Sequence, residues 1–148
     1  MPDKENSDQN KMMGQPGQKP TVLIVEDDHF LRDLVARKLE VSGFVVLQAI
    51  DGAEGLSILK DHTPDVVLLD MVLPGMSGLD ILKSIKSNPK TQSIPVVILS
   101  NLGQKGDMER AKELGADGYM VKAHTDLGEI VKTVVATQQK SSQKQKAI

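Results

Sequence analysis

Short apolar runs alternate along the chain with longer segments in which apolar residues recur at helical spacing. The runs are continuous, rich in β-branched residues and Leu, and lie at 22–25, 44–47, 66–69, 96–99 and 119–121. Polar residues do not alternate with apolar ones inside them, a pattern typical of parallel strands that are covered on both faces. The sequence therefore predicts five buried parallel strands.

A helix candidate follows each apolar run. The first ends at Gly43, a residue suited to a helix C-terminus, and the last begins beside Thr125, a residue suited to an N-cap. The three helices between them are predicted at 53–61, 78–87 and 105–114. Five βα units predict an α/β fold, namely a flavodoxin-like (βα)5 open parallel sheet with strand order 2-1-3-4-5 and helices on both faces.

The two ends of the chain differ in composition from the middle. Residues 1–20 are rich in Gln, Asn, Lys, Gly and Pro and lack an apolar run, which predicts a disordered tail and not a signal peptide. Residues 139–148 predict a flexible polar tail, so the folded domain is expected at 21–138. No stretch approaches the length of a membrane span, and we expect a cytoplasmic protein without a membrane partner.

Composition excludes several classes of function. The chain has a net charge of -2, but residues 21–138 hold 17 acidic and 12 basic residues, a net charge of -5 that disfavours nonspecific nucleic-acid binding. One Tyr, two Phe and no Trp leave little surface on which bases could stack. The absence of cysteine excludes disulfides and thiolate metal sites.

Acidic residues follow two of the predicted strands. Glu26 and Asp27 come after the first strand and Asp70 after the third, and in a doubly wound sheet the ligand crevice lies beyond the carboxyl ends of the strands. Like charges held so close are costly unless a cation joins them. Carboxylate oxygens suit Mg²⁺, which keeps several of its own waters. The sequence therefore predicts an Mg²⁺ site formed by Glu26, Asp27 and Asp70.

Ser100 and Lys122 follow the fourth and fifth predicted strands and are expected at the same crevice. This set of groups suits phosphoryl transfer, in which a carboxylate attacks phosphorus and catalysis consists mainly of positioning and charge neutralisation. In this hypothesis Asp70 is the nucleophile. Mg²⁺, Lys122 and the Ser100 hydroxyl would each contact one phosphoryl oxygen.

Four segments taken together resemble the receiver domain of bacterial two-component response regulators. They are VLIVEDD at 22–28, LLDMVLPGMSG at 68–78, ILSN at 98–101 and GYMVK at 118–122. The similarity covers essentially all of residues 21–138. The segment at 68–78 is highly specific in combination with the other three.

The resemblance implies roles for particular residues. It implies that Asp70 accepts a phosphoryl group, and that the backbone carbonyl of Val72 joins the side chains of Glu26 and Asp27 in binding Mg²⁺. It also implies a switching surface at about 105–135. The residues implied to relay the phosphorylated state to that surface are Ser100, Tyr119 and Lys122.

The same resemblance implies the kinds of partner. The phosphodonor is expected to be a sensor histidine kinase or a histidine phosphotransfer protein. The chain is expected to be a signalling domain that assists its own phosphorylation and dephosphorylation, not a classical enzyme. Because only 26 residues follow Lys122, we expect a single-domain regulator that acts in trans on a downstream protein the sequence does not identify.

Two departures from the family pattern have physical consequences. The active-site lysine of the family usually precedes a proline in a cis peptide bond, whereas Lys122 precedes Ala123. A cis bond before a residue other than proline costs about 3–4 kcal/mol, so we predict a trans bond and a locally re-routed loop.

The positions two residues after Asp70 and Ser100 are Val72 and Leu102. Apolar side chains there cannot orient a hydrolytic water, which predicts a long-lived phosphorylated form.

Three alternative functions compete with this interpretation. A flavin-binding flavodoxin-like protein would need a hydroxyl- and glycine-rich phosphate loop where this chain has three acidic residues, at 26–28. A haloacid-type phosphatase would need a second Asp where Val72 stands. The third is a degenerate receiver that binds proteins constitutively and is never phosphorylated. Retention of the acidic, hydroxyl and lysine side chains argues against this third alternative.

Overall fold

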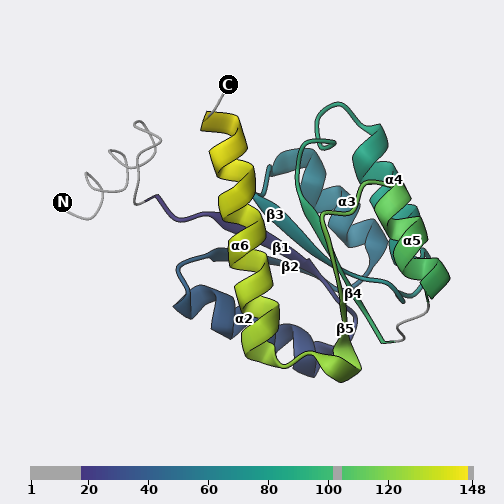
Figure 1. The fold of residues 1–148 in the computed structure, drawn as a ribbon, viewed down its shortest axis with the longest axis horizontal. Helices are drawn as coiled ribbons and strands as arrows, with labels where there is room; N and C mark the ends of the chain where they lie inside the picture. The colour runs from purple at the N-terminus through teal and green to yellow at the C-terminus, as the bar shows by residue number, and fades with distance from the viewer. Residues whose placement is uncertain (1–17, 102–104, 147–148) are drawn as a thin grey trace.

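The computed structural model of the chain describes residues 18–101 and 105–146 (Figure 1). Strands and helices alternate, and each begins and ends within two residues of its predicted bounds, except at the C-terminus of the last helix. The elements are β1 (Thr21–Val25), α2 (His29–Val41), β2 (Val45–Ala49), α3 (Gly52–Asp61), β3 (Val66–Asp70), α4 (Gly78–Ser87), β4 (Val96–Ser100), α5 (Lys105–Glu113), β5 (Gly118–Val121), the 3₁₀ turn η1 (Lys122–His124) and α6 (Leu127–Lys146).

The five strands form one parallel sheet in the order β2-β1-β3-β4-β5, which confirms the predicted topology. Helices α2 and α6 cover one face, and α3, α4 and α5 cover the other (Figure 1). Alternate residues of each strand point to opposite faces: Val22 and Ile24 pack under α2 and α6, whereas Leu23 and Val25 pack against the other layer. Burial on both faces explains why the strands appear in the sequence as continuous apolar runs.

Side-chain caps begin most of the helices. Asp28 Oδ1 accepts hydrogen bonds from the N–H groups of Phe30 and Leu31 at 3.0 and 3.1 Å, and so begins α2. Gly43, with φ of +100°, follows the C-terminus of α2 as predicted. The cap predicted at Thr125 is wrong, because Asp126 Oδ1 accepts the Glu129 N–H at 2.8 Å. A carboxylate one residue further along therefore begins α6.

Helix α6 continues to Lys146, beyond the boundary at 138 that the sequence predicted. The segment that follows Val135 contains Gln, Lys, Ser, Ala and Thr but neither Gly nor Pro. Extending a helix whose first turns are already packed avoids the cost of nucleation. Residues 139–146 are thus helical, whereas most of the predicted tail at 1–20 lies outside the described residues. Within the described part of the chain, no helix is long and apolar enough to cross a bilayer.

Candidate functional site

The carboxyl ends of four adjacent strands bring the predicted site residues to one edge of the sheet. Glu26 follows β1, Asp70 is the last residue of β3, Ser100 is the last residue of β4, and Lys122 follows β5. Glu26, Asp70 and Ser100 are each no more than 3% exposed. The parallel order of the strands places these groups together, although they lie far apart in the sequence.

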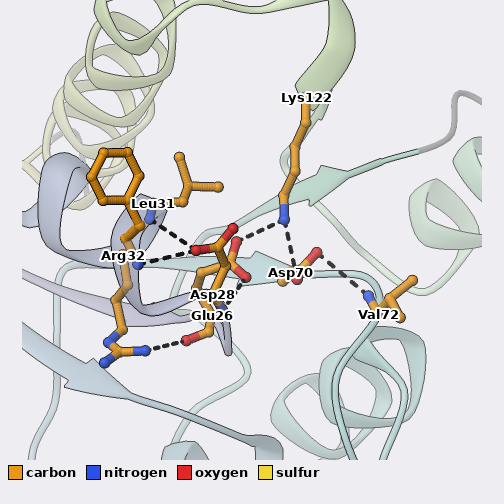
Figure 2. Close-up of polar contacts among 8 residues, drawn as sticks. Glu26, Asp28, Leu31, Arg32, Asp70, Val72 and Lys122 are labelled. Carbon is orange, nitrogen blue, oxygen red and sulfur yellow. Dashed lines mark hydrogen bonds and ion pairs between the residues drawn. The ribbon is translucent and has the colours of Figure 1, made fainter.

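Lys122 joins the two buried carboxylates. Its Nζ lies 2.8 Å from Glu26 Oε1 and 3.3 Å from Asp70 Oδ2, and Figure 2 shows the ammonium reaching down between them. The second oxygen of each carboxylate faces the backbone: Glu26 Oε2 accepts the Asp28 N–H at 3.0 Å, and Asp70 Oδ1 accepts the Val72 N–H at 3.4 Å. The buried carboxylate of Asp70 is therefore held between the Lys122 ammonium and the Val72 N–H.

Burial has opposite effects on the acid and the base of this group. The pKa of Glu26 is raised to about 7, because desolvation by burial outweighs the lowering effects of the Lys122 ammonium and the Asp28 N–H. Desolvation alone would lower the pKa of Lys122. Its contacts with Glu26 and Asp70 outweigh that effect, and the pKa of Lys122 is raised above its usual value. The ammonium is consequently retained as a charged group between the two carboxylates.

The acidic residues also fit a divalent cation. Glu26, Asp27 and Asp70 each offer an oxygen, and these oxygens lie within 4.8 Å of one another. Glu26 Oε1 is a buried oxygen that accepts no hydrogen bond of regular geometry among the described residues. Its neighbour is the Lys122 ammonium, whose Nζ lies 2.8 Å away. An all-carboxylate set with one exposed member, Asp27, suits a hard cation that keeps part of its water. The residues present therefore fit Mg²⁺.

For the remaining predicted site residues, the structure gives a position but does not test the predicted role. Tyr119 lies half-buried on β5, and its register partner on β4 is Ile98. The side chain of Val72 is 62% exposed beside Asp70. The role of its carbonyl in metal binding and the long life of the phosphorylated form stay predictions, and Leu102 lies outside the described residues. Within the described residues, the histidines are not part of the acidic cluster.

The peptide bond that follows Lys122 is trans, as predicted. Lys122, Ala123 and His124 form the 3₁₀ turn η1. The Thr125 N–H donates to the Lys122 carbonyl at 3.4 Å and ends the turn. This turn keeps the Lys122 side chain directed to the two carboxylates without a proline at position 123.

Glycine at position 78 permits the close approach of α4 to the end of β3. The Gly78 N–H donates to the Met71 carbonyl at 2.7 Å, which folds the segment between β3 and α4 back on itself. A Cβ at Gly78 would collide with the Asp70 carbonyl oxygen and lie 2.7 Å from the Met71 Cα. Backbone atoms cannot yield as a flexible side chain does, so this site accepts no side chain.

Replacing Gly78 by Ala is therefore expected to lower the free energy of unfolding by about 2 kcal/mol, as measured by urea denaturation. The matched control is Gly106→Ala in α5, where a Cβ would meet no atom within 4 Å. The control should leave stability unchanged or raise it by less than about 1 kcal/mol, because Ala favours a helix over Gly. Equal stabilities of the two variants would contradict the packing argument.

Sequence reasoning missed one basic residue at this site. Arg32, in α2, donates from Nη1 to the backbone carbonyl of Glu26 at 2.9 Å. Its position in the first turns of a helix that begins beside the acidic residues was the available signal. The direction of its side chain, toward the sheet and not toward solvent, was not readable from the sequence.

Comparison with known proteins agrees with this geometry. The sequence model of the response regulator receiver domain matches residues 22–135. The chain is 37% identical over 103 residues to RpaA, a DNA-binding dual master transcriptional regulator of Synechocystis, a match covering 70% of this chain and 43% of RpaA. It is 34% identical over 102 residues to DivK, a polar-differentiation response regulator of Brucella anthropi, covering 69% of this chain and 83% of DivK.

A solved structure shares the fold. The receiver domain of a Francisella response regulator superposes with a TM-score of 0.76 at 26% identity, covering 83% of this chain and 99% of that one. The chain thus matches less than half the length of RpaA and nearly the whole of an isolated receiver domain.

Proposed function

Because the chain belongs to the response regulator receiver family, whose members are signalling domains of two-component systems, we propose that it is a phosphorylation switch with Asp70 as phosphoacceptor. The observation that carries the proposal is the placement of the Asp70 carboxylate. It lies at the carboxyl end of β3, 3.3 Å from the Lys122 ammonium, in a cluster whose acidic oxygens lie within 4.8 Å of one another.

The proposed chemistry is attack of an Asp70 oxygen on the phosphorus of a phosphohistidine. A P–O bond forms, the P–N bond breaks, and its electron pair remains on the imidazole that leaves. Bound Mg²⁺ would neutralise charge that develops on the phosphoryl oxygens. Lys122 is close enough to contact a second phosphoryl oxygen, and the Ser100 hydroxyl at the end of β4 would bind a third.

Phosphorylation would change the balance of charge at the crevice. An acyl phosphate carries about one negative charge more than the carboxylate it replaces and adds acceptor oxygens. Lys122 and Ser100 would shift toward these oxygens, and Tyr119 on β5 would respond. In this proposal the shift alters the surface at 105–135, which comprises α5, β5 and the first part of α6, and so its affinity for a downstream protein.

The phosphodonor in this proposal is a sensor histidine kinase or a histidine phosphotransfer protein, as the family assignment suggests. The alternative is a degenerate receiver that binds its partner without phosphorylation. The ion pairs of Lys122 with both Glu26 and Asp70 favour phosphorylation over this alternative, because they keep a cation and a nucleophile at contact distance.

Incubation with acetyl phosphate and Mg²⁺ tests the proposal. We expect the intact mass to rise by one phosphoryl group, and the gain to vanish when EDTA removes the metal or hydroxylamine cleaves the acyl phosphate. No mass gain at saturating Mg²⁺ would support the degenerate receiver instead, and a gain that resists hydroxylamine would show that the phosphoryl group is not on a carboxylate and would contradict Asp70 as the acceptor.

A further inference from the structure

Arg32 makes three polar contacts beside the acidic cluster. In addition to the bond from Nη1 to the Glu26 carbonyl at 2.9 Å, Nε donates to Gln48 Oε1 on β2 at 3.2 Å, and Nη2 lies 3.2 Å from His29 Nδ1. Figure 2 shows the side chain extending from α2 to the backbone next to Glu26. Two acceptors, one directly after β1 and one on β2, fix the planar guanidinium in one orientation.

The carbonyl that Arg32 holds belongs to the peptide group between Glu26 and Asp27. On the other side of the residue, the Glu26 N–H donates to the Ala49 carbonyl of β2 at 3.1 Å. The backbone of Glu26 is therefore held at both ends, by β2 and by Arg32. The orientation of the peptide group from which Asp27 begins depends on the second of these bonds.

Asp27 differs from the other two members of the acidic cluster in how it is held. The carboxylates of Glu26 and Asp70 are each bound by Lys122 and by a backbone N–H. Within the described part of the chain, the exposed Asp27 carboxylate makes no hydrogen bond or ion pair. Its position thus follows from its backbone.

We propose that Arg32 is a positioning residue for the divalent-cation site, which it serves by fixing the Glu26–Asp27 peptide group and hence the direction of the Asp27 carboxylate. The inference rests on the proposed function, since it assumes that the acidic cluster binds Mg²⁺. Arg32 touches neither the cation nor the phosphoryl group in this scheme. Groups that orient metal ligands in this way commonly change metal affinity by about 10- to 100-fold when they are lost.

The charge of Arg32 acts in the opposite direction to its positioning effect. A cation close to the cluster repels Mg²⁺, so a neutral replacement would weaken positioning and relieve repulsion at once. Arg32→Lys separates the two effects because it keeps the charge. An ammonium on a flexible stem cannot reproduce the planar fork that joins the Glu26 carbonyl to Gln48.

The experiment is a calorimetric titration of the unphosphorylated full chain with Mg²⁺. Arg32→Lys is expected to bind Mg²⁺ about three- to tenfold more weakly than the wild type. Gln48→Leu, which leaves the charge in place but removes one acceptor, should show a smaller loss in the same direction. The matched control is Arg37→Lys on the same helix, whose exposed side chain pairs with Asp33 at 3.1 Å, and its affinity should be unchanged.

The outcomes separate the inference from the function on which it rests. Equal or tighter Mg²⁺ binding by Arg32→Lys, beside a wild type that binds normally, would overturn the positioning role alone. A lower thermal midpoint with unchanged affinity of the folded protein would also overturn it, since that is the result of a merely structural role. A wild type that binds no Mg²⁺ would overturn the inference together with the metal-dependent function.

Discussion

Replacing Asp70 by Asn is expected to abolish phosphorylation completely, because the amide nitrogen and oxygen of Asn are poor nucleophiles toward phosphorus. The variant should still fold. It keeps the shape of the side chain and removes one of two negative charges that share the Lys122 ammonium, leaving Glu26 paired with Lys122 at 2.8 Å. The measurement is the intact mass after incubation with acetyl phosphate and Mg²⁺, accompanied by thermal unfolding.

The matched control for this variant is Asp61→Asn, at the exposed end of α3. It makes the same chemical change far from the carboxyl ends of the strands and should be phosphorylated as the wild type is. A phosphoryl group that remains on Asp70→Asn would place the acceptor elsewhere and contradict the proposal. Loss of phosphorylation in both variants would mean that the loss of one negative charge prevents phosphorylation, and it would not identify Asp70 as the nucleophile.

Lys122→Met is expected to lower the free energy of unfolding by about 3 kcal/mol in the absence of metal, because it leaves two buried carboxylates without their cation. Glu26 and Asp70 side chains are only 4% and 3% exposed, so water cannot screen them well. Met fills a similar volume, and the loss therefore reports charge rather than a cavity. Urea denaturation in EDTA measures the effect.

Two further measurements test the cause. Adding Glu26→Gln to Lys122→Met should recover part of the lost stability, since it removes one of the two buried carboxylates that Lys122→Met leaves without a cation, whereas Asp70 remains. Saturating Mg²⁺ should stabilise Lys122→Met more than the wild type, because the ion supplies the missing charge. Lys132→Met, an exposed position on α6, is the control. If it proved as destabilising as Lys122→Met, the buried-charge argument would be wrong.

Several features of the site could be predicted because they depend on local pattern and topology. Continuous apolar runs indicate strands buried on both faces, and the carboxyl ends of parallel strands meet at one edge. The gathering of Glu26, Asp70 and Lys122 follows from these two facts. The trans bond at Ala123 could also be predicted, because the cost of a cis bond is a property of the dipeptide.

Other features depend on how side chains orient after the elements pack. Lys122 could have paired with either carboxylate, and the sequence does not reveal that it bridges both. Arg32 could have pointed to solvent like Arg37, five residues further along the same helix. The end of α6 at Lys146 and its cap at Asp126 depend on small differences between competing local hydrogen bonds, which periodicity does not resolve.

By itself, the sequence determined the order and type of the elements, the sheet topology and the edge at which the acidic residues gather. These follow from the spacing of apolar residues, from chain chirality and from the chemistry of each residue type. Only the tertiary structure decided which oxygen faces the Lys122 ammonium, and that Arg32 holds the Glu26 carbonyl. The reason is that such contacts join residues on different elements. The packing of helices on the sheet sets the distances of these contacts to within a fraction of an ångström. No local sequence pattern encodes distances with that precision.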